Sequence, residues 1–427
     1  MLNRAIQPGF SLPNKLEIPT PQKYFTSDGR EVLWLNIGTQ NIVRITLQFP
    51  AGTKYQSKSL QASSTVGLMP EGTKGFSAQE IAEKLDFYGS HVDYSIDRDH
   101  AMVSAFCLDK YLDATLEVLQ EIILAPTYSD EEFETYCQKR KNSLSIEKRK
   151  VMYVAREQQA AALYGMHHPY GSFAEELDYD ALTASDLRCY HKERFLDQGA
   201  LLFVSGLVNE EIVSKVAITF DSVIRRNSFD NNELDLSMLP EPNSIYIPKG
   251  DAVQSAIRVG RVLFPRSHPD YSGMQVLATV LGGYFGSRLM NNIREEKGYT
   301  YGIFSSLVAL QESGYLTIST EVGCTVTEAT LTEIRKEMEI LRSEKVDETE
   351  LSLVVNYLVG EMLRMLDGPF GIVDAILDLY QSGLPIGFIE EHFNKVKNIT
   401  SDELLLLARR YLNPLDFTEV VVGKKGS

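Results

Sequence analysis

Apolar positions along the chain follow two spacings, one typical of β-strands and one typical of amphipathic helices. Runs of consecutive or alternating apolar residues, which favour strands, occur in both halves of the chain. They predict a hairpin at 31–49, strands at 91–107, 201–205 and 256–264, a hairpin at 299–321 and a last strand at 417–422. Helical spacing fills the intervals. This arrangement predicts an α+β fold, in which mainly antiparallel sheets carry helices packed on one face.

Capping residues mark the ends of several predicted helices. Ser77 and Glu80 have the spacing of a capping box, and Gly89 is a suitable stop for the helix that they begin. Similar signals at Ser129 and Thr183 begin two further helices. In total, helices are predicted at 77–89, 109–124 and 129–164, from 183, at 271–281, 287–297, 327–343 and 347–366, and from 400.

The second half of the chain repeats the first at a nearly constant offset. Phe49, which ends an apolar run, recurs as Phe264, 215 residues later. Thr183, which begins a helix, recurs as Thr400, 217 residues later. Such a period predicts two homologous domains. The expected division is 1–225, a linker rich in Asn, Asp, Ser and Pro at 226–248, and 249–427.

Composition narrows the choice of partners. The 427 residues include 42 Lys and Arg against 58 Asp and Glu, which gives a formal net charge of −16. Such a surface repels nucleic acids and anionic lipids, so neither is an expected partner. No apolar stretch is long enough to span a membrane, and the first ten residues contain no apolar signal core. Cys107, Cys137, Cys189 and Cys324 form no paired framework, which predicts reduced thiols and a cytoplasmic location.

The most specific motif lies between residues 281 and 302. Its sequence is Leu-Gly-Gly-Tyr-Phe-Gly-Ser-Arg-Leu-Met-Asn-Asn-Ile-Arg-Glu-Glu-Lys-Gly-Tyr-Thr-Tyr-Gly. This string closely resembles the second-domain signature of the pitrilysin/insulinase superfamily of zinc peptidases, particularly its mitochondrial-processing-peptidase-like branch. The first half resembles the same family at 49–52, 72–73, 77–81 and 168–171. The resemblance covers nearly the whole chain and implies the processing-peptidase-like metallohydrolase fold.

In that family the first domain carries an inverted zinc motif, His-x-x-Glu-His, on the helix before a Gly-Thr pair. The two histidines bind the metal, and the glutamate acts as a base on the bound water. Counted back from Gly72-Thr73, the five matching positions are Ser63, Ser64, Thr65, Val66 and Gly67. None of them supplies a good zinc ligand or a base. The resemblance therefore implies a member whose zinc motif is degenerate, with no metal or other cofactor expected in this chain.

The sequence does not indicate a relocated metal site. No two histidines have the spacing of a helical zinc motif, and His168 matches a His-Pro string of the family that binds no metal. Glu147 lies near the position of the family's third zinc ligand, but its helix is rich in Lys and Arg. Glu147 is therefore expected to form an ion pair with a nearby basic residue, and we assign it no role in metal binding. The seven histidines are His91, His100, His167, His168, His191, His268 and His392.

The chain retains a second pair of family residues. In family members a helix Arg and a strand Tyr of the second domain bind the substrate backbone and the oxyanion. Arg294 and Tyr301 match these two positions, seven residues apart. The cation and the hydroxyl can both stabilise a developing negative charge. An Arg near a helix end and a Tyr in a strand are also common for structural reasons alone. The match of the surrounding string favours the functional interpretation.

Two hypotheses of different classes follow. In the first, the chain is the non-zinc subunit of a heteromeric zinc metallopeptidase that acts on unfolded peptides. A homologous partner then binds the zinc, and this chain supplies Arg294 and Tyr301, with no peptidase activity expected of it alone. In the second, the chain is a catalytically inactive scaffold or peptide-binding protein, as a hetero-oligomer or a homodimer. An independent hydrolase with an unusual zinc site is disfavoured, because the ligand spacing is missing.

Overall fold

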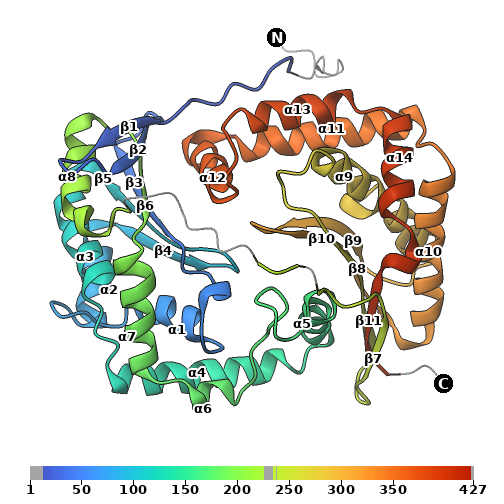
Figure 1. The fold of residues 1–427 in the computed structure, drawn as a ribbon, viewed down its shortest axis with the longest axis horizontal. Coiled ribbons are helices and arrows are strands. Elements are labelled where there is room, and N and C mark those ends of the chain that lie inside the picture. Colours follow the sequence, from blue (N-terminus) through green and yellow to red (C-terminus); the bar gives the residue numbers. More distant parts are fainter. Residues whose placement is uncertain (1–12, 226–233, 237, 425–427) are drawn as a thin grey trace, which may run out of the picture.

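The computed structural model describes residues 13–225, 234–236 and 238–424. We call the residues up to 225 the first half and those from 234 the second half. The two halves lie side by side, and each is built around one β-sheet (Figure 1). Within the described residues, no helix has the length and apolar character needed to cross a membrane. The four cysteines are free thiols.

The first sheet has the strand order β1-β2-β6-β3-β5-β4. β2 and β6 run parallel, and every other neighbouring pair is antiparallel. The strands are β1 (Gln22–Phe25), β2 (Glu31–Asn36), β3 (Ile42–Phe49), β4 (His91–Ile96), β5 (Ala101–Leu108) and β6 (Leu201–Gly206). The helices of this half are α1 (Gln61–Leu68), α2 (Ala78–Tyr88), α3 (Leu112–Leu124), α4 (Asp130–Glu147), α5 (Val151–Tyr164), α6 (Asp178–Ala181), α7 (Ala184–His191) and α8 (Glu210–Phe220).

The second sheet has the order β7-β11-β8-β10-β9. Here β7 and β11 are parallel and the remaining pairs are antiparallel. The strands are β7 (Ser244–Pro248), β8 (Gln254–Leu263), β9 (Ile303–Ala309), β10 (Gly314–Gly323) and β11 (Thr418–Gly423). The helices are α9 (Tyr271–Ala278), α10 (Thr327–Ser343), α11 (Glu348–Met365), α12 (Gly368–Gln381), α13 (Phe388–Asn398) and α14 (Ser401–Tyr411).

The two sheets share one topology. The order β2-β6-β3-β5-β4 of the first sheet corresponds strand by strand to β7-β11-β8-β10-β9 of the second, including the single parallel pair. In each half the main core lies between the sheet and the helices of the same half, with Ile45 and Leu119 at the centre of one core and Ile318 and Ile334 at the centre of the other. The predicted α+β fold with two homologous sheet-and-helix units is confirmed.

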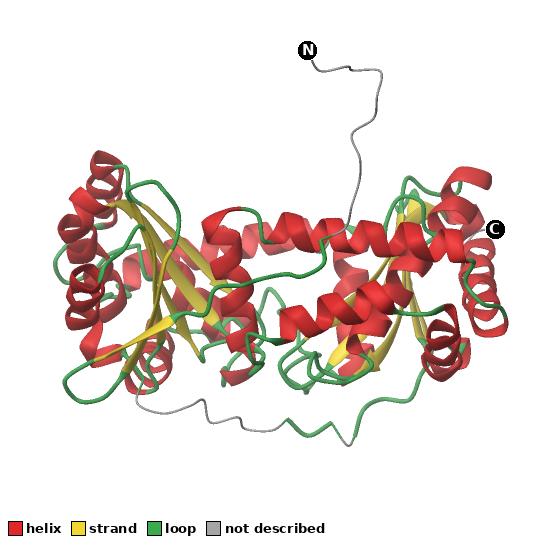
Figure 2. Cartoon of the chain, turned by 90° about the horizontal axis from the view of Figure 1, so that it is seen from above, coloured by secondary structure: helices red, strands yellow, loops and turns green. Residues whose placement is uncertain are grey.

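Each half also provides one helix that packs on the sheet of the other half. Ala155 and Ala162 of α5 pack against β8 and β11 of the second sheet. Val373 and Ile376 of α12 pack against Leu33 of β2 and the neighbouring β6 in the first sheet. The two helices begin 217 residues apart, which is the repeat offset seen in the sequence. Helices therefore lie between the two sheets as well as outside them (Figure 2), and β6 and β11 are buried on both faces.

Two local predictions are wrong, and some helices were not predicted. The predicted hairpin at 31–49 is wrong, because β6 inserts between β2 and β3, and β2 instead forms a hairpin with β1. The predicted helix at 129–164 is broken at 148–150, where the chain leaves α4 and crosses to the other sheet as α5. The helices α8, α12 and α13 were not predicted from the sequence. By contrast, the capping box of Ser77 and Glu80 and the left-handed stop at Gly89 are both present.

The predicted linker at 226–248 falls partly outside the described residues, namely at 226–233 and 237. Its final residues, Ser244–Pro248, form β7 and belong to the second sheet.

Candidate functional site

Arg294 and Tyr301 lie on the segment between α9 and β9. A π-helical turn, Met290–Glu296, carries Arg294 and ends near Gly298, which has a φ of 66°. Residues with a Cβ atom rarely adopt this left-handed conformation, so glycine is favoured there. The Gly298 amide donates to the Arg294 carbonyl over 3.0 Å, and the chain then turns toward β9. Tyr301 stands two residues before that strand.

Both side chains are accessible to solvent. Tyr301 is 93% exposed, and its hydroxyl makes no hydrogen bond within the described part of the chain. The Arg294 guanidinium carbon lies 4.5 Å from the centre of the Phe285 ring, and its Nη1 lies 3.5 Å from the Glu295 carboxylate. Stacking on a ring orients a guanidinium and leaves its N–H donors free. No contact joins Arg294 to Tyr301 in the described structure; the two residues share one short segment of the chain.

Two residues of the same motif anchor this segment, a role that the sequence analysis missed. Arg288 forms a bidentate pair with Glu350 of α11, with N–O distances of 2.9 and 2.8 Å. The amide of Asn292 donates to Glu337 of α10 over 2.6 Å. Their carboxylate partners stand more than forty residues away in the sequence, so no local pattern identifies them. These bonds hold the segment against two long helices.

All five positions of the degenerate zinc motif lie on α1: Ser63, Ser64, Thr65, Val66 and Gly67. Ser64 and Thr65 are fully buried, and Val66 is part of the core of the first half. The Thr65 hydroxyl donates to the carbonyl of Gln61, one turn earlier, over 2.8 Å. These positions therefore help to pack α1 against its own half.

Tyr136 of α4 fills the space beside this motif. A Cβ atom placed on Gly67 would lie 2.6 Å from the Tyr136 hydroxyl oxygen and 2.9 Å from its ring, closer than real Cβ contacts. The hydroxyl donates to the Ser63 carbonyl over 3.4 Å, and burial raises the pKa of this phenol. A histidine therefore does not fit at position 67 unless Tyr136 moves. The residues present do not fit a zinc ion, in donor chemistry or in space.

The other candidate ligands do not gather elsewhere. Glu147 forms an ion pair with Lys150 at 2.5 Å, in agreement with the expected ion-pair role. His168 accepts a bond from the Tyr170 amide at 3.1 Å and stacks on Tyr164. Among the described residues, no group of three or more His, Cys, Asp or Glu side chains is placed to hold a metal ion.

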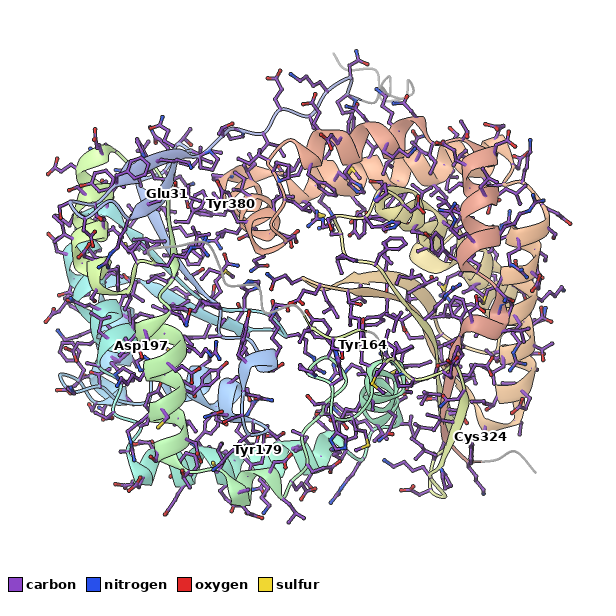
Figure 3. The ribbon with its side chains drawn as sticks, in the orientation of Figure 1. Glu31, Tyr164, Tyr179, Asp197, Cys324 and Tyr380 are labelled. Carbon is purple, nitrogen blue, oxygen red and sulfur yellow. The ribbon has the colours of Figure 1, made fainter. Side chains whose placement is uncertain are left out.

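A cavity of about 380 Å³ begins at the motif helix and extends between the halves. Ser63 lies on its wall, together with Arg98 from the β4–β5 turn, Arg156 from α5 and Tyr315 from β10. Tyr164, at the end of α5, also lines it and lies between the two halves (Figure 3). No local sequence pattern predicts this cavity, because its walls come from segments far apart in the chain.

Comparison with known proteins adds to this geometry. The profile of the family described as "Insulinase (Peptidase family M16)" matches residues 32–170, and that of "Peptidase M16 inactive domain" matches residues 181–358. The crystal structure of a peptidase M16 inactive domain from Pseudomonas fluorescens superimposes with a TM-score of 0.87 at 19% identity, covering 96% of this chain and 99% of that one. This likeness shows a common fold.

Two curated relatives come from Bacillus subtilis. "Uncharacterized zinc protease YmxG" is 22% identical over 81% of this chain and 84% of its own length. "Probable inactive metalloprotease YmfF" is 20% identical over 74% of each chain. The two profiles, the shared fold and the filled motif helix agree. The chain belongs to the insulinase family, peptidase family M16, as a member that lacks the zinc motif.

Proposed function

We propose that this chain is the non-zinc subunit of a heteromeric metallopeptidase that acts on unfolded peptides. A homologous subunit with an intact His-x-x-Glu-His motif would bind the metal. The main support for the proposal is that the chain has lost the zinc motif but has kept the Arg/Tyr pair. Tyr136 fills the space beside the degenerate motif, whereas Arg294 and Tyr301 are retained and accessible. A subunit that contributes to a partner's active site needs the pair and does not need the metal.

The surroundings of the pair support contact with a peptide. Phe285, which lies against the Arg294 guanidinium, is 63% exposed, and Phe304 in β9 is 54% exposed. Exposed apolar surface of this kind is typical of interaction sites. β9 pairs only with β10 among the described strands, and its outer edge can accept an extended peptide as a further strand. Arg294 and Tyr301 would then donate hydrogen bonds to the peptide backbone and to the oxygen that gains negative charge, at about 3 kcal/mol per donor.

The test is peptide hydrolysis by this chain alone, by a His-x-x-Glu-His homologue alone and by their mixture. We expect activity to require the mixture and to fall about 100-fold or more in Arg294→Ala. Tyr301→Phe removes only a hydroxyl from a residue that is 93% exposed, so folding should not change. Arg364→Ala is the matched control, since Arg364 is an exposed arginine on α11. Co-elution of the two subunits is checked for each variant. A variant that still forms the complex but has lost activity has a catalytic defect rather than an assembly defect. Full activity of the Arg294 and Tyr301 variants in the complex would overturn the proposal.

The alternative is an inactive scaffold or peptide-binding protein. The curated name of YmfF, "Probable inactive metalloprotease", supports this class. Under this alternative no homologue that carries the zinc motif forms a complex with the chain or is stimulated by it, and self-association or peptide binding is the activity to measure.

A further inference from the structure

The cavity between the halves has an unusual charge for this chain. Arg98 and Arg156 share the wall of this cavity with Tyr315, and the charges of Arg98, Arg156 and Arg258 all act on the Tyr315 phenol. Arg98 and Arg156 line the 380 Å³ cavity, and Arg258 lines an adjoining hollow that shares Arg156 with it. In a chain of net charge −16, three cations in one place are a local exception. Clefts lined by one sign of charge concentrate ions of the opposite sign.

In the described structure no carboxylate oxygen lies within 4.0 Å of any of these arginines, although the charge of Asp99 acts on Arg98. Arg98 donates to the carbonyls of Pro169 and Ser172 at 3.2 and 2.9 Å, and Arg258 donates to the side-chain oxygen of Gln159 at 3.1 Å. Burial lowers the pKa of Arg98 and Arg258, and Arg156 lowers both further. Like charges close to one another, two of them partly buried, cost free energy, which an anion between them would offset.

Unpaired donors at the same place give independent support. Gln159 is 2% exposed and lines the cavity, and its Nε2 has no acceptor. The Nε of Arg258 is also buried without an acceptor. Buried donors are rarely left without partners. The one carboxylate on the cavity wall, Glu157, is already paired with Lys148 at 3.0 Å. On the wall of this cavity the arginines therefore have no free carboxylate to pair with, whereas the adjoining hollow that holds Arg258 is also lined by Glu147 and Glu321.

The remaining walls indicate what the anion is attached to. A volume of about 380 Å³ lies in the range of small-molecule pockets and exceeds what a bare anion fills. Five aromatic rings face it: Tyr153, Tyr164, Tyr170, Phe173 and Tyr315. Hydroxyl and amide groups on the side of α1 could bind a peptide backbone: Thr53, Gln56, Ser59 and Ser63.

We propose that this cavity binds the C-terminal carboxylate of a peptide, with Arg98 and Arg156 holding the carboxylate and the aromatic rings holding the last side chain. Arginine matches a carboxylate through two parallel N–H bonds. The site belongs to this chain alone, so the proposal does not depend on a partner subunit or on Arg294 and Tyr301.

Calorimetric titration of the full chain with three probes tests the proposal. The probes are a short unstructured Gly/Ser peptide ending in Phe with a free carboxylate, the same peptide as a C-terminal amide, and inorganic phosphate, all at one ionic strength. We expect the acid to bind at least about tenfold more tightly than the amide, since hydrogen bonds to charged groups are the stronger kind. Arg156→Gln should abolish this preference. Arg156 is exposed, so this variant should fold.

Arg149→Gln is the matched control. It removes the same charge from an exposed residue just before α5 and outside the cavity wall, and it should keep the preference. Equal binding of acid and amide would overturn the proposal, and so would an equal effect of the two substitutions. Binding of phosphate as tight as that of the peptide acid, with mutual displacement, would assign the site to a free anion and overturn the peptide assignment.

Discussion

The Tyr136 hydroxyl donates a hydrogen bond to the carbonyl oxygen of Ser63 over 3.4 Å and holds the phenol ring against the helix of the degenerate motif. The ring lies where a side chain at position 67 would be. The motif helix therefore lacks both the zinc ligands and the space for a larger side chain at position 67. A metal site cannot be recovered by substitution within α1 alone.

The contact between Tyr136 and Gly67 makes a prediction for stability. Gly67→Ala should destabilise the fold by about 1–3 kcal/mol, because the added methyl group overlaps the ring of Tyr136. Gly360→Ala is the matched control, since Gly360 lies within α11 with open space around its Cα. That change should stabilise the protein by about 0.5–1 kcal/mol. Urea unfolding of the two variants measures both, and a stabilising effect of Gly67→Ala would contradict the packing described.

A buried ion cluster joins the two halves through Lys54. Its ammonium nitrogen lies 3.0 Å from a carboxylate oxygen of Asp99 and 3.0 Å from one of Glu312, and its side chain is 2% exposed. Lys54→Met should cost about 3–5 kcal/mol, because two carboxylates remain without their cation. Lys345→Met removes one partner of an exposed pair and should cost about 1 kcal/mol or less. Thermal unfolding compares the stability of the Lys54→Met and Lys345→Met variants. Equal losses of stability would show that the buried cluster is no stronger than a surface pair.

The exchanged helix α12 makes a prediction about local opening. Ile376 is fully buried against the first sheet, although it belongs to the second half of the chain. Ile376→Ala should cost about 2–5 kcal/mol and should speed amide exchange in β2 and β6. Ile334→Ala is the control, since Ile334 is equally buried but faces the second sheet. Hydrogen exchange with peptide-level detection measures the amide exchange rates of these strands in both variants. Faster exchange confined to the second half in Ile376→Ala would contradict the packing of α12.

Two buried histidines predict a loss of stability in mild acid. Burial lowers the pKa of His191 and of His392 to about 4. The unfolded chain, with a pKa near ~6.5, binds protons that the folded chain does not, so stability falls as pH falls from about 6.5 toward 4. Between pH 7 and pH 5 each histidine should account for about 2 kcal/mol.

Urea unfolding at pH 7 and pH 5 measures this effect. His392→Gln should reduce the difference between the two pH values. His91→Gln, at an exposed position, is the control and should leave it unchanged. An unaltered pH difference in the His392 variant would mean that this ring is protonated in the fold.

Much of the local structure could be predicted because its causes are local. The capping box of Ser77 and Glu80 satisfies backbone donors at the helix start, and Gly298 adopts the left-handed conformation that its helix end requires. The continuous apolar run at 201–205 indicated a strand, and β6 is buried on both faces. Arg294 and Tyr301 could be nominated because one contiguous string carries both. Their catalytic role stays a prediction.

By itself, the sequence determined most of the strands and helices, the repeat, the lack of zinc ligands at the motif positions and the segment that carries Arg294 and Tyr301. Each of these depends on neighbouring residues or on a fixed spacing. Only the tertiary structure decided that α5 and α12 cross to the opposite sheet, that Tyr136 lies beside the motif helix, and that Arg98, Arg156 and Tyr315 line one cavity. Periodicity shows which face of a helix is apolar, but not which of two similar sheets will cover it. That choice depends on contacts between residues far apart in the chain.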